Sequence, residues 1–133
     1  MAEPAPRPVL LTVEPQLFVT DMPRAITFFV NKLGFSIGFT YGEPPFYAEV
    51  VRDAAMLNLR HVDLPVIDRS TESDLLSAAV TVSHAGRLFA EFKERGVPFR
   101  ETLVRKPWHE AGQGSFIVED PDGNLLLFAG LTD

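Results

Sequence analysis

The chain has 133 residues and contains no cysteine, which excludes disulfide bonds, thiolate metal sites and catalysis by a thiol. It has a single tryptophan, and its three histidines are scattered along the sequence. It lacks the run of about 20 apolar residues that a membrane-spanning helix requires, and its N-terminus lacks the basic-then-apolar pattern of a signal peptide. These absences, with a length that is ordinary for one domain, predict a single-domain cytoplasmic protein.

Positive charge is also scarce. There are 12 Lys and Arg residues against 18 Asp and Glu residues, so the formal net charge is −6. Nucleic-acid binding requires a basic face for the phosphates, and this balance therefore argues against it. An acidic surface attracts cations, including cationic small molecules, although the same charge can serve only to keep a protein soluble.

The first half of the chain predicts a strand, a helix and three further strands. Asp21 fits the N-cap of the helix, and Gly34 fits the residue just after its end. Pro15 cannot donate a ladder hydrogen bond, so the first strand is expected to be an edge strand or to be bulged there. The expected elements are a strand over 9–19, a helix between Asp21 and Gly34, and strands over 35–41, 46–51 and 55–59.

The second half repeats this pattern. We expect a strand over 76–82, a helix that Ser83 caps, a strand over 98–104, a loop over 105–112 and a closing hairpin. An internal repeat of about 60 residues is a strong architectural signal. It predicts an α+β fold in which paired βαβββ modules form a curled mixed sheet around a cleft. The expected parts are an arm over 1–8, modules over about 9–61 and 75–130, and a linker over 62–74.

The closing hairpin has the clearest turn chemistry. Asp120-Pro121-Asp122-Gly123 fits a type I turn, with Asp first, Pro second and Gly fourth. Apolar residues 116–118 lead into this turn and apolar residues 125–128 leave it. This pattern predicts two buried antiparallel strands.

Residues 18–35, which read FVTDMPRAITFFVNKLGF, and residues 120–124, which read DPDGN, carry a resemblance when taken together. The sequence resembles the glyoxalase/bleomycin-resistance/extradiol-dioxygenase superfamily, also called vicinal oxygen chelate, over residues 9–130. The resemblance implies paired βαβββ modules, commonly assembled as a homodimer.

Many members of that superfamily bind a divalent metal through His, Gln or Glu at four strand positions. The matching positions in this sequence are Glu14, Asn58, Ser77 and Leu127. One carboxylate, one amide, one hydroxyl and one aliphatic side chain do not make such a site, so we expect no metal and no other cofactor. The alternative is a metal-dependent lyase, isomerase or dioxygenase whose ligands lie elsewhere, for example at His61, His109 or Glu110.

Within the superfamily, the sequence most resembles the metal-free bleomycin-binding proteins. The shared features are Leu33-Gly34-Phe35, Val50-Val51-Arg52-Asp53 and Pro107-Trp108. In those proteins the flat heteroaromatic part of the drug lies between aromatic side chains in a groove at the dimer interface. The resemblance assigns that role to Phe39, Tyr47 and Trp108. It implies non-catalytic sequestration of a flat cationic ligand, such as a bleomycin-type glycopeptide, and hence antibiotic resistance.

In those relatives the N-terminal segment is exchanged between subunits. The same exchange would give the proline-rich arm of this sequence a function, whereas the alternative is that the arm is disordered. The spacing between Phe39 and Tyr47 is longer here, because residues 42–45 are inserted. This difference leaves open a third hypothesis, a metal-free protein that binds another metabolite.

Further candidate ligand-binding residues are Phe46, His61 and His109. Phe46 precedes Tyr47, His61 ends a strand, and His109 follows the single tryptophan and is the best candidate for pH-dependent binding. Strand aromatics are also common core residues, so packing is the alternative role for them. The acidic residues that could form a negative rim around a ligand are Glu43, Glu49 and Glu110.

Overall fold

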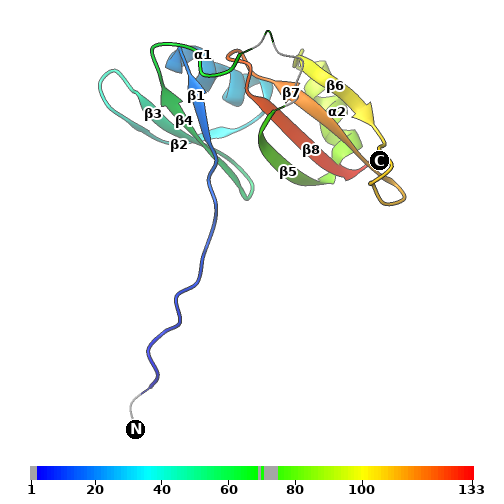
Figure 1. Ribbon diagram of the computed structural model, residues 1–133, viewed down its shortest axis with the longest axis horizontal. Coiled ribbons are helices and arrows are strands. Elements are labelled where there is room, and N and C mark those ends of the chain that lie inside the picture. The colour runs from blue at the N-terminus through cyan, green and yellow to red at the C-terminus, as the bar shows by residue number, and fades with distance from the viewer. Residues whose placement is uncertain (1–2, 69, 71–74) are drawn as a thin grey trace.

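The computed structural model describes residues 3–68, 70 and 75–133. Figure 1 shows two βαβββ units beside one another, each with its helix on one side of a sheet. This arrangement confirms the predicted α+β architecture of paired modules. The first unit contains β1 (Gln16–Val19), α1 (Met22–Thr27), the π-helical segment η1 (Phe28–Lys32), β2 (Ser36–Tyr41), β3 (Tyr47–Arg52) and β4 (Ala55–His61). The second contains β5 (Leu76–His84), α2 (Ala85–Glu94), β6 (Phe99–Val104), β7 (Gln113–Glu119) and β8 (Leu125–Leu131).

The two sheets have the same topology. Among the described residues, the strand orders are β1-β4-β3-β2 and β5-β8-β7-β6. The first strand of each half pairs in parallel with the last, and the other neighbours are antiparallel. Both sheets are therefore mixed, and the internal repeat seen in the sequence is a repeat of the fold.

One face of each sheet is buried against its helix. In β3, Ala48 and Val50 are fully buried beneath the first helical segment, while Tyr47 and Glu49 lie on the opposite, partly exposed face. In the second module, Phe92 of α2 makes edge contacts with Phe116 and Phe128. The face away from α1 is called the open face of the first sheet below, because it carries the candidate site.

The expected first strand is shorter than predicted. Residues 3–15 form neither helix nor strand, and Figure 1 shows this arm extending away from the rest of the chain. Pro15 accepts a hydrogen bond from the Asn58 backbone N–H (3.0 Å) but has no N–H to donate, and β1 begins only after it. In the linker expected over 62–74, residues 62–68 contain no helix or strand. Residues 1–2 of the expected arm, and 69 and 71–74 of that linker, lie outside the described residues.

Of the two predicted helix caps, one is correct and one is wrong. The Asp21 carboxylate accepts a hydrogen bond from the Arg24 backbone N–H (3.0 Å), as expected for an N-cap. The prediction that Ser83 caps α2 is wrong, because β5 continues through His84, and His84 occupies the N-cap position. The His84 side chain makes no cap hydrogen bond, and its Nδ1 lies 3.0 Å from Asp133 Oδ1.

The closing hairpin connects the two modules. The turn forms as predicted, with the Gly123 N–H donating to the Asp120 carbonyl (3.0 Å). Asp122 Oδ1 accepts from the backbone N–H of Thr20 (2.9 Å) and from its hydroxyl (2.7 Å). Asn124 Nδ2 donates to the Phe18 carbonyl (3.1 Å). A turn of the second module is thus bonded to the end of β1 in the first.

The pKa of the Asp120 carboxyl is expected to lie well above that of an ordinary aspartate. Asp120 is 1% exposed, and burial raises the pKa of its carboxyl from 3.8 to about 6, although the carboxyl accepts hydrogen bonds from Asp122 and Asn124. The folded state binds the Asp120 proton more tightly than the unfolded state does, so protonation of Asp120 stabilises the fold. This contribution is complete below the unfolded pKa and is lost as pH rises through about 6. The difference corresponds to at most about 3 kcal/mol.

Carboxyl carbon NMR on the folded protein measures this titration, and urea unfolding at pH 5 and pH 7 measures the accompanying loss of stability. A midpoint near 4 for Asp120 would contradict the expectation.

None of the helices in the described part of the chain has the length and apolar character of a membrane span.

Candidate ligand-binding site

The open face of the first sheet carries a flat aromatic wall. Phe39 pairs in register with Glu49, and Tyr41 with Tyr47, so all four side chains lie on one face. The rings of Phe39 and Tyr47 stack, with centroids 6.1 Å apart and planes 16° apart. Gln16 Nε2 donates to the Tyr47 hydroxyl (2.9 Å), which fixes the orientation of that ring. Phe39 remains 45% exposed, so a ligand can reach this wall.

A second aromatic pair continues the wall at the β2–β3 turn. Tyr41 and Phe46 meet edge to face, with centroids 5.5 Å apart, and are 66% and 45% exposed. The His61 backbone N–H donates to the Phe46 carbonyl (2.9 Å), so the end of β4 lies beside this turn. The structure therefore brings the candidates Phe39, Phe46 and Tyr47 together, with His61 at the margin.

Trp108 and His109 lie elsewhere. Figure 1 shows their loop, which precedes β7, at the far end of the second module beside the C-terminus, whereas the β2–β3 turn lies at the opposite end of the molecule. Trp108 is 73% exposed, and Lys106 Nζ lies 5.7 Å from the centre of its ring. His109 Nδ1 accepts from the Lys106 backbone N–H (2.7 Å), which holds the loop. One chain alone does not place Trp108 against the aromatic wall.

Two of the four positions that match metal ligands in relatives lie at the open face of the first sheet. Asn58 of β4 stands opposite Glu49 of β3, and the backbone contact from Asn58 to Pro15 brings the adjacent Glu14 to the same place. Glu14 Oε1 and Asn58 Oδ1 are buried and have no hydrogen-bond partner among the described residues. These oxygens are part of a polar cluster beside the aromatic wall.

The other two positions supply no metal ligand. The Ser77 hydroxyl donates to Asn124 Oδ1 (3.2 Å) and is used within the hairpin, while Leu127 pairs with Ile117 and Ala79 and is aliphatic. Within the described ranges, no group of three or more His, Cys, Asp or Glu side chains is arranged to hold a metal ion. The donor set in this chain therefore does not fit the divalent metal that the fold implies.

Sequence analysis missed several residues of this face. Gln16 and Tyr41 were not singled out, and Glu49 was predicted only as part of an acidic rim. Side chains alternate between the two faces of a strand, so residues 47 and 49 of β3 share a face. This alternation could have placed Glu49 beside Tyr47 from the sequence alone. The position of Glu14 could not be read this way, because it precedes β1 and follows no strand period.

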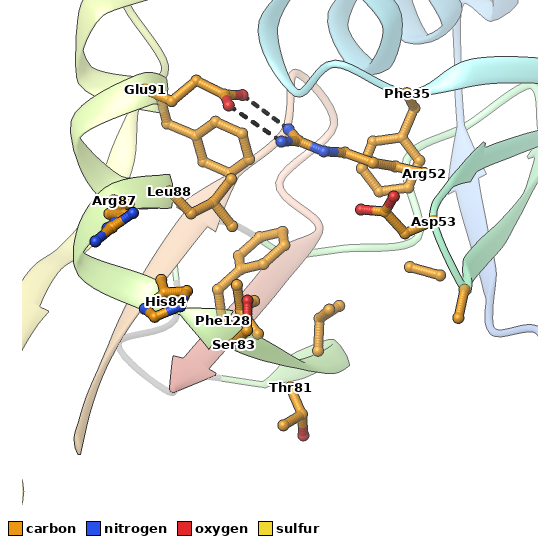
Figure 2. Close-up of a pocket in the computed structure, with 15 residues that line it drawn as sticks. Phe35, Arg52, Asp53, Thr81, Ser83, His84, Arg87, Leu88, Glu91 and Phe128 are labelled. Carbon is orange, nitrogen blue, oxygen red and sulfur yellow. Dashed lines mark hydrogen bonds and ion pairs between the residues drawn. The ribbon is translucent and has the colours of Figure 1, made fainter. Parts of the chain in front are cut away.

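A cavity between the modules is lined by none of the predicted site residues. It has a volume of about 490 Å³, and Figure 2 shows it beneath the bidentate ion pair of Arg52 with Glu91. Its lining combines apolar side chains, such as Leu88 and Phe128, with the polar Thr81, Ser83 and His84. Two of its charged side chains, Arg52 and Glu91, are paired with each other.

The fold and this face define a class: a domain of paired βαβββ modules with an open, aromatic sheet face. The chain belongs to the Glyoxalase/Bleomycin resistance protein/Dioxygenase superfamily, whose family model matches residues 10–128. No curated protein matches the sequence.

Solved structures share the fold. A glyoxalase/bleomycin resistance protein/dioxygenase from Alicyclobacillus acidocaldarius is 23% identical, with 91% of each chain covered and a TM-score of 0.74. The bleomycin-binding protein of Streptomyces verticillus, solved with copper(II)-bleomycin, is 23% identical over 93% of this chain and 98% of that one, with a TM-score of 0.70. A lactoylglutathione lyase from Agrobacterium tumefaciens is 16% identical over 93% and 96%, with a TM-score of 0.67.

Proposed function

We propose that this protein binds and sequesters a flat, cationic small molecule in grooves formed between two copies of the chain. The observation that carries the proposal is the stacked pair of the exposed Phe39 and the partly buried Tyr47 on the open face of the first sheet. Ligand sites are typically apolar and aromatic surfaces with a few placed polar groups, and this face has that composition. The structural likeness to a bleomycin-binding protein supports a bleomycin-type glycopeptide as ligand and a role in antibiotic resistance.

The separation of the aromatic residues favours a dimer. The loop that carries Trp108 lies at the opposite end of the molecule from the β2–β3 turn (Figure 1), so a second copy of the chain is needed to bring a Trp108 to the aromatic wall. A planar ligand held between two rings gains about 0.5–1.5 kcal/mol per ring beyond the burial of its area. A symmetric pair would form two such grooves, each with residues from both chains.

The N-terminal arm supports the same assembly. Leu10 is 98% exposed and Leu11 is 90% exposed, and Val9 and Val13 are also largely exposed in the single chain. Contiguous apolar side chains of this kind are a usual sign of an interaction surface. We therefore include exchange of this arm between the two copies in the proposal.

Sequestration needs no nucleophile, general base or metal, and it needs only affinity. Calorimetric titration with metal-free and copper-loaded bleomycin tests the function. We expect saturable binding of about one ligand per chain. An absence of heat with both forms of bleomycin, on protein that circular dichroism shows to be folded, would overturn a bleomycin-type ligand.

A lactoylglutathione lyase has the same fold, so metal-dependent catalysis is the alternative function. A separate experiment tests it. Elemental analysis of the purified protein and melting curves with added zinc, manganese and iron(II) reveal any tight metal, since a ligand of the folded state raises the melting temperature. Because Ser77 and Leu127 supply no ligand, we expect no stoichiometric metal and no shift in melting temperature.

A further inference from the structure

The polar cluster beside the aromatic wall consists of the side chains of Glu14, Glu49 and Asn58. The carboxyl group of Glu49 is in hydrogen-bonding contact with that of Glu14. This contact raises the pKa of Glu49, with burial and the like charge of Glu14 adding to the effect. No lysine or arginine in the described part of the chain forms an ion pair with either carboxylate.

The buried atoms of the cluster are left without partners. Glu14 Oε1 and Asn58 Oδ1 are both inaccessible to solvent and accept no hydrogen bond among the described residues. Leaving a buried acceptor unpaired is unfavourable, and two adjacent carboxylates repel each other. A group that carries several N–H donors and a positive charge would satisfy these oxygens and remove the repulsion.

We propose that Glu14, Glu49 and Asn58 form a subsite for an organic cation, an ammonium, amidinium or guanidinium group of the ligand whose flat part lies on the Phe39–Tyr47 wall. The subsite rests on the proposed function and specifies its ligand: an aromatic plane with a nitrogen cation at its edge. Phe39 stands directly across the strand pair from Glu49, and Tyr47 is two residues from it on the same face. The cationic group and the aromatic plane of one ligand would therefore contact neighbouring side chains of the protein.

Gly38 makes room for this arrangement. It lies in the irregularity of β2 between Ile37 and Phe39, and a Cβ at this position would overlap the carboxyl of Glu49. The Glu49 carboxyl thus lies against the backbone of β2 at Gly38. Glu49 is only partly buried, so its carboxyl can move when a ligand group reaches the oxygens of Glu14 and Asn58.

The acceptors suit an organic cation better than a metal ion. Zinc or iron needs three or more imidazole or carboxylate ligands around one point, and the second sheet contributes only Leu127 and a hydroxyl already bonded within the hairpin. An amidinium or guanidinium group is satisfied by two or three oxygens on one side, and its flat face can continue the aromatic stack.

Fluorescence titration with two flat probes of similar shape tests the inference. 4′,6-Diamidino-2-phenylindole carries two amidinium groups, and 2-phenylindole carries none. We expect the wild type to bind the diamidine at least about tenfold more tightly, because a charge-assisted hydrogen bond is roughly twice as strong as a neutral one. Glu49→Gln and Glu14→Gln should remove this preference and leave the affinity for 2-phenylindole unchanged.

Two controls distinguish the subsite from a general effect of surface charge and from a structural role of Glu49. Glu94→Gln removes the same charge from the exposed surface of α2 and should leave the preference intact. Glu49→Gln should melt at or above the wild-type temperature, since it relieves the contact of like charges; a lower melting temperature with both probes weakened equally would mean a structural role and overturn the subsite. Equal affinity of the wild type for the two probes would also overturn the subsite. Displacement of the diamidine by micromolar zinc would overturn it as well.

The same variants are then titrated with bleomycin. If the wild type binds bleomycin and Glu49→Gln binds it equally well, the subsite is wrong and the proposed function stands. If the wild type binds neither bleomycin nor either flat probe, both are wrong.

Discussion

Asn124→Ala is expected to lower the free energy of unfolding by about 3 kcal/mol, the largest loss of stability that we predict. The Asn124 side chain is 2% exposed and makes three hydrogen bonds: to the Phe18 carbonyl (3.1 Å), to Asp120 Oδ2 (2.9 Å) and from the Ser77 hydroxyl (3.2 Å). Alanine would leave buried partners unpaired on both modules. Urea unfolding followed by circular dichroism measures the difference.

Asn31→Ala is the matched control. Asn31 is exposed in η1, and its side chain makes no hydrogen bond to another described residue. Its replacement is expected to change stability by no more than about 0.5 kcal/mol. If Asn124→Ala were as stable as Asn31→Ala, the hydrogen bonds of the Asn124 side chain would contribute little to stability.

Tyr47→Ala and Trp108→Ala are each expected to weaken ligand binding by at least about tenfold, and a refolded mixture of the two is expected to recover part of it. In a dimer with grooves shared between chains, each groove takes Tyr47 from one chain and Trp108 from the other. A mixed dimer therefore has one intact groove and one with both residues missing. With random pairing, about a quarter of all grooves regain wild-type affinity.

Calorimetry on the mixture, unfolded together in urea and refolded, counts these intact grooves. The two variants mixed without unfolding provide the control for subunit exchange. If the site lay within one chain, the refolded mixture would bind no better than either variant alone, and the shared groove would be wrong. Full affinity of Trp108→Ala by itself would remove that residue from the site.

Features that depend on neighbours in sequence were predictable. The turn at 120–123 and the Asp21 cap both follow from residue types at fixed offsets, and both form as expected. The repeat of the two halves was also readable, because each strand and helix has its own periodicity and the order of elements recurs. This order is what predicted the fold.

Features that depend on tertiary context were not predictable. Ser83 has a good capping side chain, but pairing of β5 with β8 extends the strand to His84, where it opposes Leu131. The contact between Glu14 and Glu49 joins residues far apart in sequence, and only the pairing of β2, β3 and β4 places them together. Likewise, sequence suggested a common role for Tyr47 and Trp108, but it gave no sign that one chain holds them apart.

The bonds from the closing turn to Thr20 and Phe18 have a consequence for how this chain can change over evolutionary time. They hold the halves together through side chains, in addition to the covalent connection between β4 and β5. The entropic cost of a longer connection grows slowly, by about 0.6 kcal/mol for each doubling of its length. Insertions between the two halves are therefore expected to cost little stability, whereas a substitution in the turn that closes the chain affects both halves at once.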